Sequence, residues 1–122
     1  MSELQKRILL IEHEQTLREI LRLLLADEAG YELVEATTME RGMAALALQS
    51  FQLILTDGFS ATPQGVVEAT APLRQAAGDT PIVLITAHAV KPAEALAAGF
   101  AAVVEKPFNL DALLDQIRAL LA

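Results

Sequence analysis

The chain has 122 residues, a length typical of one domain, and 53% of them are hydrophobic, which is enough for a full core. Its net charge of -7 and its lack of any basic run disfavour direct binding to nucleic acid or to an anionic membrane. Because cysteine is absent, disulfides, thiolate metal sites and cysteine nucleophiles are excluded. The polar N-terminus and the shortness of the apolar runs predict a cytoplasmic protein without a signal peptide or membrane span.

Five short apolar runs recur along the chain and predict strands. None shows the alternation of a half-exposed strand, and such continuous runs are typical of strands buried on both faces of a parallel sheet. The expected strands are residues 8–11, 31–34, 51–55, 82–85 and 103–104.

A helix is predicted between the first two strands. Its apolar stripe consists of Leu17, Ile20, Leu21 and Leu24, which have the i, i+3, i+4, i+7 spacing of one helix face. We expect this stripe to pack in the core. Gly30 follows where a C-terminal cap is expected.

Four further helices are expected at residues 39–49, 66–77, 92–98 and 110–121. Thr37 or Thr38 could cap the first of these, and Asn109 could cap the last. Pro72 is expected to kink or interrupt the helix in which it lies, because proline has no N–H for the helical ladder.

Strands therefore alternate with helices throughout the chain. This order predicts an α/β fold: a doubly wound (βα)5 three-layer sandwich with a five-stranded parallel sheet. We expect one domain over residues 1–122, without an attached output domain. In such sheets, ligands bind at the carboxyl ends of the strands.

Polar residues follow four of the predicted strands. They are Glu12, His13 and Glu14 after the first strand, Asp57 after the third, Thr86 after the fourth and Lys106 after the fifth. The fold would gather them at one edge of the sheet. Carboxylates can hold a divalent cation, and a hydroxyl and an ammonium group can bind the oxygens of a phosphoryl group.

In this order, four motifs over about residues 7–121 resemble the response-regulator receiver domain of two-component signalling. The motifs are the strand running into Glu12, residues 53–57 ending in Asp57 (with Gly65 eight positions later), residues 81–87 containing Thr86, and Lys106-Pro107-Phe108. The last motif often includes a cis bond before proline in that family. The resemblance implies a flavodoxin-like fold and a signalling module rather than an enzyme.

The resemblance also implies a role for each site residue. Asp57 would accept a phosphoryl group from a histidine kinase or phosphotransfer protein, Thr86 would hydrogen-bond a phosphoryl oxygen, and Lys106 would pair with Asp57 and then with the phosphate. Glu12, Asp57 and the backbone carbonyl of Phe59 would be ligands of Mg²⁺, although Glu12 could instead be a partner of Lys106. Output would be binding to a downstream protein, by a monomer or a weak homodimer.

Other positions depart from the family or vary within it. His13 stands where a second carboxylate usually binds Mg²⁺, and imidazole suits zinc, copper, nickel or iron better, so we expect Mg²⁺ binding to be weak or lost. We expect His13 to be a solvated loop residue rather than a ligand. Val103 replaces a Tyr or Phe whose ring usually moves with Thr86. His88, like Phe59, would occupy a position that tunes hydrolysis of the acyl phosphate.

Three functions are consistent with these residues. The first is a phosphorylatable receiver, acting as a stand-alone regulator or as a phosphorelay intermediate. The second is a degenerate receiver that binds proteins without phosphorylation, which His13 and Val103 favour. The third is a cofactor-binding domain such as a flavodoxin, which the acidic segment after the first strand disfavours because it would repel a phosphate.

Overall fold

A single parallel sheet forms the centre of the molecule, and its strands are arranged in the order β2-β1-β3-β4-β5. The computed structural model describes residues 5–58, 63–87 and 90–122. The strands are β1 (Arg7–Ile11), β2 (Glu32–Ala36), β3 (Leu53–Asp57), β4 (Ile82–Thr86) and β5 (Ala102–Glu105). The expected doubly wound α/β architecture is therefore confirmed.

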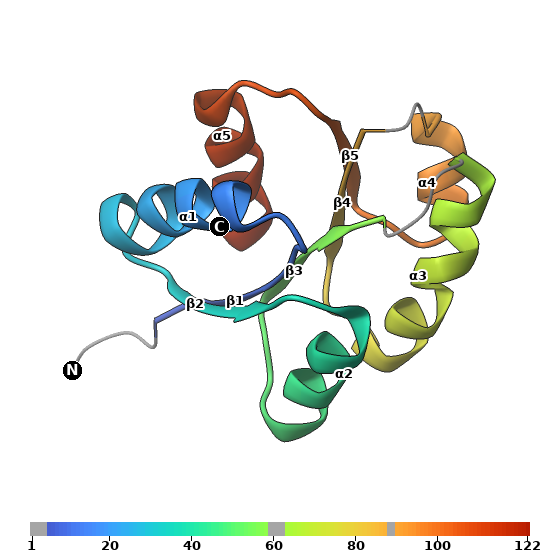
Figure 1. The fold of residues 1–122 in the computed structure, drawn as a ribbon, viewed down its shortest axis with the longest axis horizontal. Coiled ribbons are helices and arrows are strands. Elements are labelled where there is room, and N and C mark those ends of the chain that lie inside the picture. The colour runs from blue at the N-terminus through green and yellow to red at the C-terminus, as the bar shows by residue number, and fades with distance from the viewer. Residues whose placement is uncertain (1–4, 59–62, 88–89) are drawn as a thin grey trace.

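In the part of the chain that the structure describes, six helical segments surround the sheet. They are α1 (Gln15–Arg22), η1 (Leu23–Glu28), α2 (Met39–Leu48), α3 (Pro63–Ala77), α4 (Pro92–Ala97) and α5 (Leu110–Leu121). Helices α1 and α5 cover one face of the sheet, and α2, α3 and α4 cover the other (Figure 1). Over the described ranges, no helix combines the length and the apolar character that crossing a membrane requires.

Two hydrophobic clusters pack against the two faces of the sheet. The α1/α5 cluster includes Leu21, Leu25 and Ile117, and the α2–α4 cluster includes Leu73 and Ala95. Strands β3 and β4 contribute to both clusters, and every residue of these two strands is buried. This explains why the strands lack alternation in the sequence.

The first helix differs from its sequence pattern. It passes from α1 into the π-helical segment η1, in which the Ala29 N–H donates to the Leu24 carbonyl at 3.0 Å. Leu25 is fully buried in place of Ile20, which is 38% exposed, so the prediction that Ile20 packs in the core is wrong. The wider turn keeps Leu21 and Leu25 on the same face.

The predicted helix ends are largely confirmed. Thr38, rather than Thr37, caps α2 by accepting the Arg41 N–H at 3.1 Å, and Asn109 caps α5. Gly30 has a φ of 79° just after η1, as a C-terminal cap requires.

Helix α3 continues through Pro72, so the interruption considered for that position does not occur. Pro72 and the residue one turn earlier, Glu68, both lie on the exposed side of α3. Water can therefore bond to the carbonyl that the proline leaves without an N–H donor.

Candidate functional site

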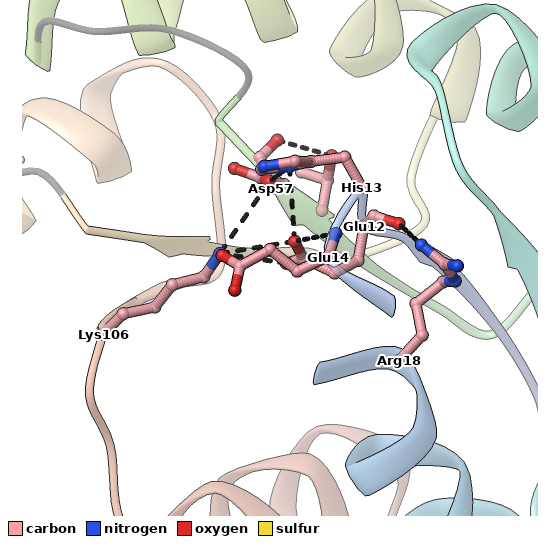
Figure 2. Close-up of polar contacts among 7 residues, drawn as sticks. Glu12, His13, Glu14, Arg18, Asp57 and Lys106 are labelled. Atoms are coloured by element: carbon pink, nitrogen blue, oxygen red, sulfur yellow. Dashed lines mark hydrogen bonds and ion pairs between the residues drawn. The ribbon is translucent and has the colours of Figure 1, made fainter. Parts of the chain in front are cut away.

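The polar residues at the strand ends meet at one edge of the sheet, as expected. Glu12 follows β1, Asp57 ends β3, Thr86 ends β4 and Lys106 follows β5. These four strands are consecutive in the sheet, so their carboxyl ends lie next to one another. Figure 2 shows Glu12, His13, Glu14, Asp57 and Lys106 gathered around the end of β3.

Asp57 is buried at the centre of this group, with 7% of its surface exposed. Its Oδ2 contacts His13 Nδ1 and lies 3.8 Å from Lys106 Nζ. Its backbone carbonyl accepts the hydroxyl of Thr56 at 2.9 Å, which fixes the end of the strand. The next residue is Gly58, where an added Cβ would lie 2.7 Å from Val66 Cγ2, so α3 approaches the site closely.

Lys106 is the cation of the site and pairs with three carboxylates. Its Nζ lies 3.1 Å from Glu12 Oε1 and 3.2 Å from Glu14 Oε1, closer than to Asp57. The expected pair with Asp57 is therefore present but is the longest of the three. Burial lowers the pKa of the Lys106 ammonium group, but Glu12, Asp57 and Glu14 outweigh burial and raise that pKa above its usual value.

The main chain fixes the position of Lys106 on the sheet. Its N–H donates to the Thr86 carbonyl at 2.8 Å, which continues the pairing of β5 with β4. The peptide bond from Lys106 to Pro107 is cis, as the resemblance suggested.

Glu12 is fully buried, an unusual environment for a carboxylate. Its Oε2 accepts the Glu14 N–H at 3.2 Å, whereas Oε1 accepts no hydrogen bond of good geometry although Lys106 Nζ lies 3.1 Å away. Burial and the neighbouring Asp57 carboxyl raise the pKa of Glu12, against the lowering effect of the Glu14 N–H and of Lys106.

The His13 side chain is 58% exposed, so the expectation of a solvated residue holds for only part of the ring. Its Nδ1 contacts Asp57 Oδ2 and lies 3.5 Å from Glu12 Oε2. One ligand atom from each of Glu12, His13 and Asp57 lies within 4.8 Å of the others. The set contains an imidazole nitrogen, so it does not fit Mg²⁺, which prefers oxygen ligands in a tight octahedron.

Thr86 is buried, with 1% of its surface exposed, at the same edge of the sheet. In the pairing of β3 with β4, Asp57 lies opposite Ile85, so Thr86 is one position further along. Phe59 and His88 lie outside the described residues. Val103 lies opposite Leu84 in the sheet and packs against the α2–α4 cluster.

Sequence reasoning assigned no role to Glu14, although it is the third residue of the Glu12-His13-Glu14 run. Its side chain is 52% exposed at the rim of the site. There it borders a hollow of about 380 Å³ between α1 and the loop after β5. The hollow has apolar walls that include Ile20 and Phe108.

The sequence matches the family model of the response regulator receiver domain over residues 8–118. No curated protein matches the chain. Among solved structures, the chain is similar to the response regulator TrrA of Thermotoga maritima, solved in complex with Mg(2+)-BeF. The two are 28% identical with a TM-score of 0.77, over 95% of this chain and 99% of that one.

Two further structures are each 25% identical to the chain. The chemotaxis protein CheY4 of Vibrio cholerae has a TM-score of 0.80, over 96% of this chain and 99% of that one. A CheY-like receiver domain protein from Methanospirillum hungatei has a TM-score of 0.82, over 95% of this chain and 93% of that one. The family match spans most of the chain, and these structures share its sheet and helices. The chain therefore belongs to the response-regulator receiver domain family, the phosphoryl-accepting modules of two-component signalling.

Proposed function

We propose that Asp57 is the phosphoryl acceptor of this receiver and that a histidine kinase or phosphotransfer protein is the donor. The observation that supports this most strongly is the position of Asp57. It is a buried carboxylate at the end of the central strand β3, with Lys106 3.8 Å from its Oδ2. Glu12 is more deeply buried and lies closer to Lys106, so it is the poorer nucleophile.

In the proposed reaction, a carboxylate oxygen of Asp57 attacks the phosphorus of a phosphohistidine. The new P–O bond gives an acyl phosphate while the P–N bond breaks, and the imidazole leaves with the electron pair and takes up a proton. The Lys106 ammonium group would neutralise negative charge on the phosphoryl oxygens, and the Thr86 hydroxyl would donate a hydrogen bond to one of them. Both would stabilise the charge on these oxygens during the transfer.

Receiver domains bind Mg²⁺ at an acidic site, and here the oxygen ligands would come from Glu12, Asp57 and the Phe59 carbonyl. We expect binding of Mg²⁺ to be weak in this chain, because His13 supplies nitrogen where the family usually supplies a carboxylate.

The proposed output is a binding event. Residues 1–122 would act as one domain, as a monomer or a weak homodimer, that presents a phosphorylation-dependent surface to a downstream protein. Histidine kinases draw on ATP, so we place this reaction in the cytoplasm.

A second candidate function is a degenerate receiver that binds its partner without phosphorylation. The pairing within the pocket favours it. His13 already contacts Asp57, and Lys106 lies closer to Glu12 and Glu14 than to Asp57. A phosphoryl group on Asp57 would have to displace the contact with His13 and draw Lys106 away from Glu12 or Glu14.

Incubation with a small phosphodonor, with and without Mg²⁺, separates the two candidates by intact mass. We expect the wild-type chain to gain one phosphoryl group and Asp57→Asn to gain none. Asp79→Asn is the matched control, because Asp79 lies in the turn between α3 and β4, away from the carboxyl ends of the strands, and should label like the wild type. An absence of labelling under every metal condition would favour the degenerate receiver.

A further inference from the structure

We propose that the pocket formed by Glu12, His13 and Asp57 binds a divalent transition-metal ion, such as Zn²⁺, Co²⁺ or Ni²⁺, in preference to Mg²⁺. The inference concerns the same pocket as the proposed function and rests on it only for the importance of Asp57. The metal site itself depends on the arrangement of the three side chains.

The three side chains already stand close to the geometry of a metal site. One ligand atom from each lies within 4.8 Å of the others (Figure 2). Such ligands bind at about 2.0–2.2 Å, so two ligands on opposite sides of an ion are up to roughly 4.4 Å apart. His13 Nδ1 faces both carboxylates, since it contacts Asp57 Oδ2 and lies 3.5 Å from Glu12 Oε2. Small side-chain rotations would bring all three around one ion.

A second, independent observation comes from Glu12. Its carboxylate is fully buried, and its Oε1 accepts no hydrogen bond of good geometry. Lys106 Nζ lies 3.1 Å from this oxygen, so a cation is close by, but no hydrogen bond replaces the lost hydration of Oε1. A metal ion bound beside His13 and Asp57 would give Oε1 a direct bond.

The net negative charge of the pocket also favours binding of a divalent cation. Glu12, Glu14 and Asp57 surround the single ammonium group of Lys106. When all are ionised, the group carries two excess negative charges, which one divalent ion would cancel.

The imidazole of His13 decides which ion this is. Magnesium keeps an octahedron of oxygen atoms, whereas a mixed set of nitrogen and carboxylate oxygen suits zinc, cobalt and nickel. The His13 side chain is 58% exposed, so an ion can reach the pocket from solvent.

Metal binding to the unphosphorylated chain tests the proposal. Co²⁺ binding is followed by its visible absorption, and Zn²⁺ and Mg²⁺ binding by calorimetry. We expect one ion of Co²⁺ or Zn²⁺ per chain, bound at least about tenfold more tightly than Mg²⁺. His13→Ala should weaken binding of Co²⁺ and Zn²⁺ by at least about tenfold. His13→Asp should reverse the preference, strengthening Mg²⁺ binding while weakening Co²⁺ binding.

Asp79→Asn is the matched control, because it removes a carboxylate in the turn between α3 and β4, away from the carboxyl ends of the strands. It should leave the Co²⁺ spectrum and affinity unchanged. Wild-type binding of Mg²⁺ as tight as that of Zn²⁺, full Co²⁺ affinity in His13→Ala, or its loss in Asp79→Asn would each overturn the assignment. The metal affinities are measured without a phosphoryl group, so the two proposals can be tested separately. Asp57 can be phosphorylated in a chain that does not prefer Co²⁺ or Zn²⁺, and a chain that prefers these ions can lack phosphorylation of Asp57.

Discussion

The ammonium group of Lys106 pairs with three carboxylates near the end of β3, so it can approach a phosphoryl group only by leaving one of them. Its partner Glu14 is half exposed and can be rehydrated, whereas Glu12 is fully buried. Releasing Glu14 therefore costs less free energy than releasing Glu12. When a phosphoryl group adds negative charge at Asp57, we expect Lys106 to leave Glu14 first and to keep its contact with Glu12.

The raised pKa of Glu12 predicts how stability changes with pH. The unfolded chain loses this proton near the ordinary value of 4.5, whereas the folded chain keeps it to higher pH. The free energy of unfolding should therefore fall as pH rises from about 4.5 through the folded-state pKa. Glu12→Gln lacks this proton, so its stability relative to wild type should rise across the same window. Urea unfolding in EDTA measures the stability of the two proteins over this pH range. A difference in stability between them that does not change with pH would contradict the raised pKa of Glu12.

The members of the site could be predicted from the sequence, but their pairing could not. Glu12, Asp57, Thr86 and Lys106 each follow a strand, and parallel strands bring their carboxyl ends to one edge. The contacts of Lys106 with Glu14 and of His13 with Asp57 depend on side-chain reach across loops, which no periodicity encodes. The sequence therefore predicts a pair of Lys106 with Asp57 and allows one with Glu12, but it predicts no contact of Lys106 with Glu14.

At the scale of elements, α2 and α3 pack closely against the ends of the strands that carry Glu12 and Asp57. Thr38 begins α2, whose Gly42 packs directly on Ile11 at the end of β1. Gly58 brings α3 close to the end of β3, where Asp57 lies. The two strand ends that carry Glu12 and Asp57 are therefore each backed by a helix in close contact.

Thr38→Ala should destabilise the protein by about 1 kcal/mol, because the Arg41 N–H loses its partner at the start of α2. Thr37→Ala is the matched control at the neighbouring position and should change the free energy of unfolding by less than about 0.5 kcal/mol. Urea unfolding measures both. If Thr37→Ala lowers the free energy of unfolding more than Thr38→Ala does, Thr37 rather than Thr38 caps α2.

Gly58→Ala should destabilise the protein by about 1–3 kcal/mol, because the new Cβ would lie within 2.8 Å of both methyl groups of the fully buried Val66. Adding Val66→Ala removes those methyl groups, so the double variant should be more stable than the sum of the two single losses predicts. A coupling of about 0.5–3 kcal/mol is expected in urea unfolding. Strict additivity would show that the close approach does not matter.

Element boundaries were harder to predict than element types. Strands were expected at residues 31–34 and 51–55, but β2 is Glu32–Ala36 and β3 is Leu53–Asp57. Tyr31 and Phe51 pack against the core just before their strands begin, so the apolar pattern reported burial rather than sheet pairing. The π-helical turn of η1 likewise left no signal in an apolar spacing that fits an ordinary helix.

At the scale of the whole molecule, the sheet joins the two hydrophobic clusters. Strands β1, β3 and β4 each contribute some fully buried residues to one cluster and others to the second, so losing either cluster would expose buried residues of the sheet. The architecture could be predicted because every strand lies between helical patterns, and right-handed crossovers leave few ways to connect them.

Both clusters should therefore unfold in one transition. Tyr31 is the single tyrosine of a chain without tryptophan and packs on the α1/α5 cluster, so its fluorescence reports on that side. Leu73→Ala removes core atoms from the α2–α4 cluster and should lower the free energy of unfolding by about 2–5 kcal/mol. The unfolding midpoint should shift equally when followed by fluorescence and by far-UV circular dichroism. Leu48→Ala is the control, because Leu48 is 85% exposed. Separate midpoints for the two probes would show that the clusters unfold independently.

Identifying the phosphorylated residue tests the proposed function most directly. After incubation with a small phosphodonor, borohydride reduces an aspartyl phosphate to homoserine, and tandem mass spectrometry locates the change. We predict homoserine in place of Asp57, with Glu12, Glu14 and both histidines unmodified. A phosphoryl group retained on His13, a reduced residue elsewhere, or an unmodified Asp57 would contradict the role proposed for this carboxylate.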